Sequence, residues 1–187
     1  LNQTANNTNN LTLHQDIHIN PIGRENLDHI TKDRKLAILR KGVNAVPELW
    51  RAIMENPANW NVGISDKKNK KVMFRNRNGD VEIGDLSKVL NMIASEGIDY
   101  VDLFLEELYS ELPLKDMTIR RLMECQLFTI PGEEDEDINS PERTRIHEEY
   151  HTRIEDKIND ILTLHKKKIV SRLHKFIAQI ETNELEL

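Results

Sequence analysis

The last quarter of the chain constrains the fold most, because it carries one helical pattern from Glu142 to about Thr182. Apolar residues recur there at steps of three and four, which is the spacing of one helix face. They are Ile146, Tyr150, Ile154, Ile158, Leu162, Ile169, Leu173, Phe176, Ile177 and Ile180. The steps do not keep a strict heptad, because His165 or Lys166 falls within the stripe. The pattern predicts a long amphipathic helix that packs on its own domain, on a partner, or on both.

Further helices are expected earlier in the chain. Thr31 can cap a helix that Gly42 ends, and Pro47 suits the first turn of the next one. The range 85–112 has a long apolar face at helical spacing, and 116–128 predicts a shorter helix.

A group of strands lies between these helices. The segments 61–65, 71–76 and 80–84 are rich in β-forming residues, and Asn78-Gly79 is a strong hairpin signal between the last two. Together with the helices they predict an α+β fold, in which helices pack on a small antiparallel sheet.

The segment 11–20, LTLHQDIHIN, alternates apolar and polar residues and predicts a half-buried strand. Its apolar residues are Leu11, Leu13, Ile17 and Ile19. A lone strand must pair with the domain's own sheet or with the same strand of another subunit. The expected layout is an Asn- and Thr-rich arm over 1–20, an α+β domain over 21–130, an acidic linker over 131–141 and the long helix over 142–187.

Composition limits the classes of function. The net charge of −6 argues against wrapping nucleic acid by bulk electrostatics. The single cysteine, Cys125, cannot form an intrachain disulfide or a cysteine-based zinc site, and it favours a reducing, intracellular setting. No apolar run approaches the length of a membrane span, and the polar start predicts no secretory signal.

HEEYH, residues 147–151, matches the H-E-x-x-H pattern of zinc peptidases letter for letter. Such enzymes need a third zinc ligand downstream. The position at which one class has a third histidine is Lys157, and the later acidic residues lie on the same continuous helix and cannot fold back. We interpret the motif as a solvated histidine pair. Zinc or nickel binding at His147 and His151, and a zinc hydrolase, are the weaker alternatives.

A second histidine pattern lies in the arm. His14, Asp16 and His18 share one face of the expected strand, but four residues separate the two histidines by ~13 Å, too far for one ion within a chain. A plain polar face is the simpler interpretation. The alternative is an oligomer axis at which copies of His18 converge on an ion.

Basic residues crowd around the expected β-turns. They are Lys67, Lys68, Lys70, Lys71, Arg75 and Arg77. A second basic stretch on the final helix comprises His165, Lys166, Lys167, Lys168, Arg172, His174 and Lys175. A solvated turn is the simpler interpretation of the first group, and contact with nucleic-acid phosphates is the alternative.

The run 19–31, INPIGRENLDHIT, resembles the C-terminal region of an uncharacterised protein family of giant DNA viruses, and the similarity continues to roughly Leu112. The shared pattern N-P-x-G-x-E-N-x-x-x-I is carried by Asn20, Pro21, Gly23, Glu25, Asn26 and Ile30. Proteins of that family often begin with a two-Cys-two-His zinc finger, a coiled coil and an Asn/Thr-rich repeat. This chain departs from the pattern over 55–57. The resemblance implies a viral, intracellular, oligomeric and DNA-associated context and carries no catalytic residues.

The expected function is a non-enzymatic oligomerisation and protein-interaction module of a viral zinc-finger protein. Its interface is expected at Leu11, Leu13, Ile17, Ile19, Ile154, Ile158, Leu162, Ile169, Leu173 and Phe176. The expected partner is a second or third copy of the chain, with DNA bound through a domain outside it and no cofactor. A nucleic-acid-binding module that uses the basic hairpin, and a structural virion component, are the alternatives. The expected location is the host cytoplasm, the viral factory or the virion.

Overall fold

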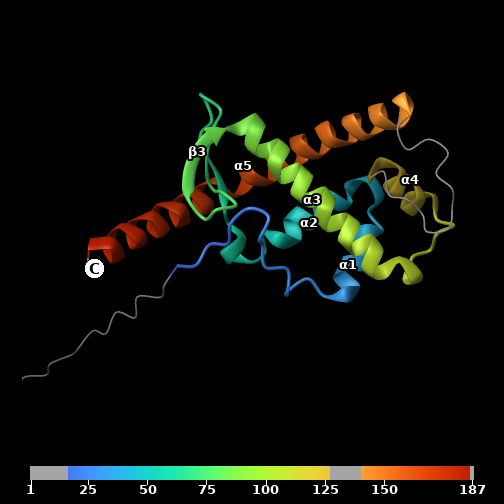
Figure 1. Ribbon diagram of the computed structural model, residues 1–187, viewed down its shortest axis with the longest axis horizontal. Helices are drawn as coiled ribbons and strands as arrows, with labels where there is room; N and C mark the ends of the chain where they lie inside the picture. The colour runs from blue at the N-terminus through green and yellow to red at the C-terminus, as the bar shows by residue number, and fades with distance from the viewer. Residues whose placement is uncertain (1–16, 127–139, 186–187) are drawn as a thin grey trace, which may run out of the picture.

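The computed structural model describes residues 17–126 and 140–185, which form helices around a three-stranded antiparallel sheet (Figure 1). The expected α+β class is confirmed. In chain order the elements are α1 (Lys32–Leu39), the 3-10 turn η1 (Gly42–Asn44), α2 (Ala45–Ile53), the 3-10 turn η2 (Pro57–Asn59), β1 (Val62–Asp66), β2 (Lys71–Arg75), β3 (Val81–Asp85), α3 (Leu86–Leu108), the 3-10 turn η3 (Tyr109–Glu111), α4 (Met117–Gln126) and α5 (Pro141–Leu185).

Local signals in the sequence explain several of these boundaries. The Thr31 hydroxyl accepts a hydrogen bond from the backbone N–H of Arg34 and caps α1. Gly42 follows α1 with a φ of +57°, a conformation that a side chain would disfavour. Gly79 has a φ of +99° in the turn between β2 and β3, as expected for the Asn-Gly hairpin signal.

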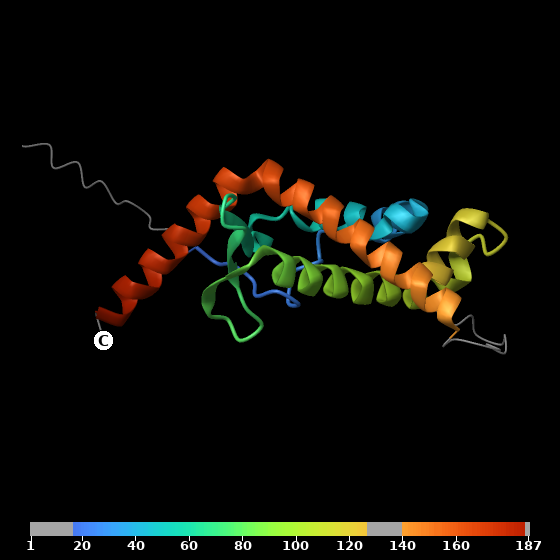
Figure 2. The same ribbon diagram turned by 90° about the horizontal axis from the view of Figure 1, so that it is seen from above.

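The sheet lies between helices on both faces, with α5 on one side and α3 on the other (Figure 2). Gly63 faces α5, because a β-carbon there would lie 3.0 Å from side-chain atoms of Ile169 and Val170. Gly84 belongs to the opposite face, where a β-carbon would lie 3.3 Å from the side chain of Val89 in α3. The two glycines therefore let both helices approach the backbone of the sheet closely.

Other elements of the same chain cover the apolar stripe of α5. This 45-residue helix bends near its middle and contacts α3, α2, α4 and the strands (Figure 2). The stripe residues from Tyr150 to Phe176 that the sequence pattern selects are all buried in the same core as the sheet and α3. The expected layout treats 142–187 as a region separate from the α+β domain over 21–130. In the structure, α5 contributes to the core of that domain.

The segment before α1 is held by a buried polar network. The Glu25 carboxylate is 7% exposed and accepts hydrogen bonds from the Gly23 backbone (2.9 Å), Asn61 Nδ2 (2.7 Å) and the Tyr100 hydroxyl (2.7 Å). The side-chain oxygen of the buried Asn59 accepts from the Asn20 amide and from the backbone N–H of Asn26, at 2.8 and 2.9 Å. Asn20, Gly23, Glu25 and Asn26 of the N-P-x-G-x-E-N pattern therefore have structural roles, because they attach this segment to the residues just before β1 and to α3.

The arm strand is not present in the part that is described. Ile17 and Ile19 have no regular secondary structure, and Leu11 and Leu13 lie outside the described residues. The backbone of Asn20 and Ile22 instead donates to Ala58 and Arg75, at 2.6 and 3.1 Å. Ile19 is fully buried in the chain's own core, so it cannot serve as the expected intersubunit contact.

Close packing of α2 on α3 yields a test of the fold. A β-carbon at Gly97 would lie 2.6 Å from Trp50 Nε1 and 2.6 Å from a methyl group of Val46. Helix propensity alone favours alanine over glycine by about 1 kcal/mol. We expect Gly97→Ala to lower the free energy of unfolding by about 1–3 kcal/mol nevertheless, because overpacking outweighs propensity.

Urea unfolding followed by circular dichroism measures this difference. Leu103→Ala is the matched control, since Leu103 lies on the same helix and is 56% exposed, and we expect it to change stability little. A Gly97→Ala variant as stable as the parent would contradict the close approach of α2 to α3.

Candidate nucleic-acid interface

Two basic stretches that are far apart in the sequence lie together in the structure. The second half of α5 crosses β1, and Gly63 in β1 meets Ile169 and Val170. Lys166 lies close enough to Asp66, at the end of β1, for its charge to lower the pKa of that carboxyl group. The lysines that follow Asp66 therefore neighbour the lysines of α5.

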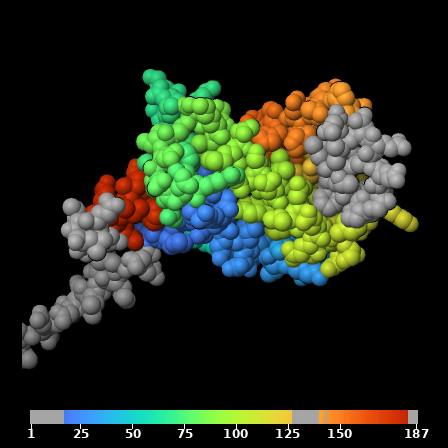
Figure 3. Space-filling view, viewed as in Figure 1, coloured from blue at the N-terminus to red at the C-terminus, as the bar shows by residue number. Residues whose placement is uncertain are grey.

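The turn between β1 and β2 projects from the body of the molecule (Figure 3). The Asp66 carboxylate organises it by accepting hydrogen bonds from the backbone N–H and the amide of Asn69, at 3.0 and 2.7 Å. These bonds are the main cause of the lowered pKa of Asp66. Because this carboxylate is engaged with the turn, it leaves Lys67, Lys68 and Lys70 exposed and without an ion pair to any described residue.

The α5 part of the surface carries one sign of charge. From Ile161 to Ile180 the helix has five Lys or Arg residues and no Asp or Glu. None of the five forms an ion pair within residues 17–126 and 140–185. We call the combined set the basic surface, and its members are Lys67, Lys68, Lys70, Lys166, Lys167, Lys168, Arg172 and Lys175.

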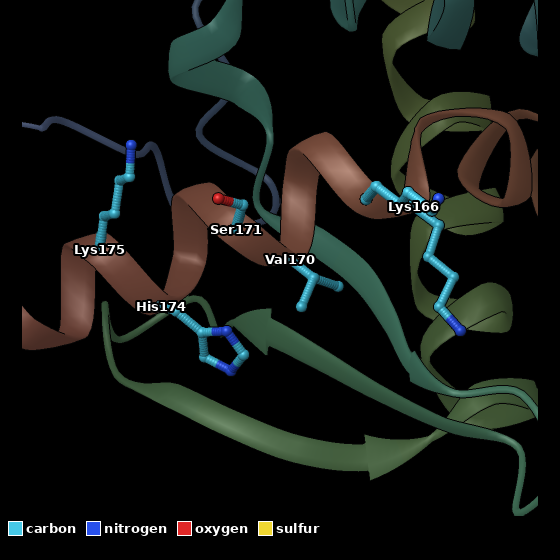
Figure 4. Close-up of a pocket in the computed structure, with 6 residues that line it drawn as sticks. Lys166, Val170, Ser171, His174 and Lys175 are labelled. Atoms are coloured by element: carbon cyan, nitrogen blue, oxygen red, sulfur yellow. The ribbon is translucent and has the colours of Figure 1, made fainter.

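Two shallow hollows flank the Ser171–Lys175 ridge of α5. The first has a volume of about 490 Å³ and is lined by Lys166, Lys167, Val170, Ser171, His174 and Lys175. In Figure 4, His174 and Val170 extend to the side of the helix on which the strands lie, and Lys175 extends to the other side. The second hollow, of about 300 Å³, is lined by Ile17, Trp60, Lys168, Ser171, Arg172 and Lys175. Cationic side chains thus border both sides of the helix.

Three of the expected hairpin cations have other roles. Lys71 pairs with Asp85 at 2.5 Å, and Arg77 pairs with the buried Glu96. Arg75 donates to the backbone carbonyls of Ile19 and Gly79. Its guanidinium also lies 4.9 Å from the centre of the Phe176 ring. Nucleic-acid contact by these six cations stays a prediction. Lys71, Arg75 and Arg77 have partners within the chain, whereas Lys67, Lys68 and Lys70 form no ion pair with any described residue.

The expected oligomer interface on α5 is also corrected. Its residues have between 0 and 7% exposure and belong to the chain's own core: Ile154, Ile158, Leu162, Ile169, Leu173 and Phe176. A side chain that is already buried within one molecule offers no surface to a second one. Self-association through Leu11 and Leu13 stays a prediction, because these two residues lie outside the described ranges.

The histidines of HEEYH take part in helix–helix contacts. His147 Nδ1 lies 2.9 Å from the backbone carbonyl of Cys125 in α4. His151 Nε2 lies 3.4 Å from the Ser95 hydroxyl of α3, and its Nδ1 lies 3.2 Å from Glu155. Among the described residues no group of three His, Cys, Asp or Glu side chains is arranged to hold a metal ion. His18, the third weak metal candidate, is exposed and its Nε2 lies 2.8 Å from the Asn20 side-chain oxygen.

The contacts join Ser95, His151 and Glu155 in the order of a hydrolase triad. A hydrolase of this kind also needs free hydrogen-bond donors that stabilise an oxyanion. Ser95 lies inside α3, where backbone N–H groups donate to carbonyl groups one helical turn earlier. They are therefore not free to stabilise an oxyanion. We interpret the three residues as a polar contact that fixes α5 against α3.

Negative charge gathers away from the basic surface. Between Val89 and Leu114 there are six acidic residues and no Lys or Arg. The second half of α3 points toward α4, whereas the sheet and the second half of α5 lie at the other end of the long axis (Figure 1). Three of these six carboxylates are ion-paired, Glu96 with Arg77, Glu107 with Lys35 and Glu111 with Lys32. We call this end of the molecule the acidic end.

Comparison with known proteins finds no matching family model, curated protein sequence or solved structure. No helix in the described part of the chain has an apolar stretch long enough to cross a membrane.

The sequence locates the basic stretches but not their proximity. Trp60, which lines the second hollow, gives no sequence signal of a surface role, since its neighbours predict only a strand. The approach of Lys166 to the β1–β2 turn depends on how α5 crosses the sheet, and no local pattern specifies this crossing.

A largely buried carboxyl group at the acidic end, that of Asp102, predicts an unusual pH dependence of the protein's stability. Burial, and secondarily the charges of Asp99 and Glu106, raise the pKa of Asp102 to about 7. Its Oδ1 atom is buried without a hydrogen-bond partner among the described residues. A folded-state pKa above the unfolded value of about 3.9 means that protonated Asp102 favours folding, and this contribution is lost as pH rises through 7.

We therefore expect Asp102→Asn to raise the melting temperature at pH 8, where the parent carries a poorly solvated charge, and to raise it less or not at all at pH 5. Thermal unfolding followed by circular dichroism at both pH values measures the difference. Asp160→Asn, at an exposed position of α5, is the matched control with little effect at either pH. An equal gain for Asp102→Asn at both pH values would contradict the raised pKa.

Proposed function

We propose that this chain binds the phosphate backbone of nucleic acid through the basic surface. The single observation that carries the proposal is the approach of Lys166 in α5 to Asp66, which brings the unpaired cations of α5 next to Lys67, Lys68 and Lys70 of the β1–β2 turn. Phosphate contacts are made chiefly by Lys and Arg side chains whose charge is available to a ligand.

The clustering of unpaired cations supports this proposal more than the absence of ion pairs does, because Lys115, Arg120 and Arg121 also form no ion pair within the described residues. Lys32, Lys35 and Arg34 each form an ion pair at 2.5–3.0 Å with a glutamate, away from the basic surface. The eight cations of the basic surface have no such partner in the part of the chain that the structure describes. Like charges that lie together repel one another and lower stability, and a bound anion would offset this repulsion.

Charge segregation reconciles the proposal with the acidic composition. The second half of α3, which carries acidic residues and no Lys or Arg, lies toward the other end of the molecule, so we expect a polyanion to approach the hairpin and α5 instead. The proposal also agrees with the resemblance to zinc-finger proteins of giant viruses, because a basic module would add sequence-independent contacts to those of a finger.

Binding is tested with a fluorescently labelled DNA duplex of 20 base pairs and a single strand of the same length, by anisotropy over a series of NaCl concentrations. We expect affinity for both ligands to fall steeply as salt rises, because binding releases counterions. The variant Lys166→Gln/Lys167→Gln/Lys168→Gln should weaken binding at least tenfold. Its log–log salt dependence on the duplex should also be shallower, by about 0.9 for each phosphate that the variant no longer neutralises.

Lys115→Gln/Arg120→Gln/Arg121→Gln is the matched control. It removes the same charge from three exposed positions on and beside α4, at the acidic end. Equal loss of affinity in both triple variants would show that net charge alone governs binding, and no binding by the parent at low salt would overturn the proposal.

A further inference from the structure

The hollow between α5 and the N-terminal segment differs from the rest of the basic surface, because it combines cations with an aromatic side chain. It is lined by Trp60 and Ile17 on one side and by Lys168, Arg172 and Lys175 on the other. Its volume of about 300 Å³ is at the lower end of the range for small-molecule pockets. It can therefore receive one planar ring, but not the edge of a duplex.

Contacts within the chain build this hollow. The Ile17 backbone N–H donates to Gln179 Oε1 at 2.8 Å, and Arg172 donates to the His18 carbonyl at 3.3 Å. These bonds dock the N-terminal segment on α5 and close one wall. Trp60 is fixed from behind, because its Nε1 donates to the Met54 carbonyl at 2.9 Å. The indole is therefore held in place before any ligand arrives.

The cations of the hollow are incompletely satisfied. The Nε atom of Arg172 is buried without a hydrogen-bond partner among the described residues, which is unusual for a native guanidinium. Lys168 and Lys175 are exposed and have no ion pair in the described ranges. An anion that accepts a hydrogen bond from Arg172 would offset the free-energy cost of burying part of its guanidinium.

We propose that this hollow binds an unpaired base of single-stranded nucleic acid, stacked on Trp60, with the adjacent phosphates on Lys168, Arg172 and Lys175. This inference rests on the proposed function and names its preferred substrate class. A base within a duplex is stacked on its neighbours and cannot reach an aromatic ring, whereas every unpaired base has a free π-face. Stacking on an aromatic side chain combined with a cationic groove is the usual means of binding single strands.

Intrinsic fluorescence gives a direct test, because the chain has two tryptophans and one of them, Trp50, is only 3% exposed. The probes are oligo(dT) and oligo(U) of 12 nucleotides and a DNA duplex of 12 base pairs, at low salt. We expect both single strands to quench the emission and to protect it from acrylamide, and the duplex to do neither. The comparison of the two single strands distinguishes DNA from RNA as the tighter ligand.

Two variants separate stacking from folding. Trp60→Phe keeps an aromatic ring and should retain single-strand affinity while losing the quench. Trp60→Leu should weaken single-strand binding about tenfold or more and leave duplex binding unchanged, since only the stacked base is lost. Circular dichroism checks that both variants fold. If Trp60→Leu does not fold, the quenching and acrylamide protection of the parent still decide the question.

The outcomes distinguish this inference from the proposed function. Salt-sensitive binding of single strand and duplex alike, without quenching or protection, would overturn the stacking site and leave phosphate binding by the basic surface intact. Absence of binding to any of the three probes would overturn both.

Discussion

The fold depends on covering the apolar stripe of one very long helix. α5 has 45 residues and would extend over about 67 Å if it were straight. An isolated helix of this composition gains little stability from propensity alone, and its apolar face must be buried. The first half of the stripe packs against α3 and α4 and the second half against β1 and β2, so a single helix joins the helical part of the molecule to the sheet.

This arrangement has a consequence for charge. The apolar positions of the second half of α5 face the sheet, so its lysines lie on the flanks of the helix, and Lys166 approaches the β1–β2 turn. The same packing removes the apolar stripe as a surface for another molecule. Because its apolar stripe is buried in the core, α5 offers a second molecule its lysines and not its apolar face.

The N-terminal segment forms one wall of the hollow beside α5. Glu25 and Asn59 hold its backbone through buried hydrogen bonds, and Arg75 joins it to the hairpin and to Phe176. These contacts bring Ile17 beside α5 and complete the hollow that Trp60 lines. The buried polar network contains no cation of the basic surface, but it positions the N-terminal segment that forms one wall of the hollow.

Local patterns predicted the elements well, whereas their contacts could not be predicted. Thr31, Gly42 and the Asn78-Gly79 turn set element boundaries through short-range backbone chemistry, which a sequence displays directly. The periodicity of α5 predicted an apolar face but not what covers it, because a stripe bound for a partner and one bound for the core look alike. The identity of Arg75 likewise gave no sign that its guanidinium is used internally, since its partners Ile19 and Phe176 are remote in sequence.

The most direct test of the central claim is a map of where a ligand touches the chain. Backbone amide NMR spectra of the ¹⁵N-labelled protein, titrated with a 12-nucleotide single strand at low salt, report each position separately. We expect shift changes over residues 66–71 and 165–176 together, and none over α4. Changes confined to one of the two stretches, or spread over the acidic half of α3, would contradict a single shared phosphate-binding surface.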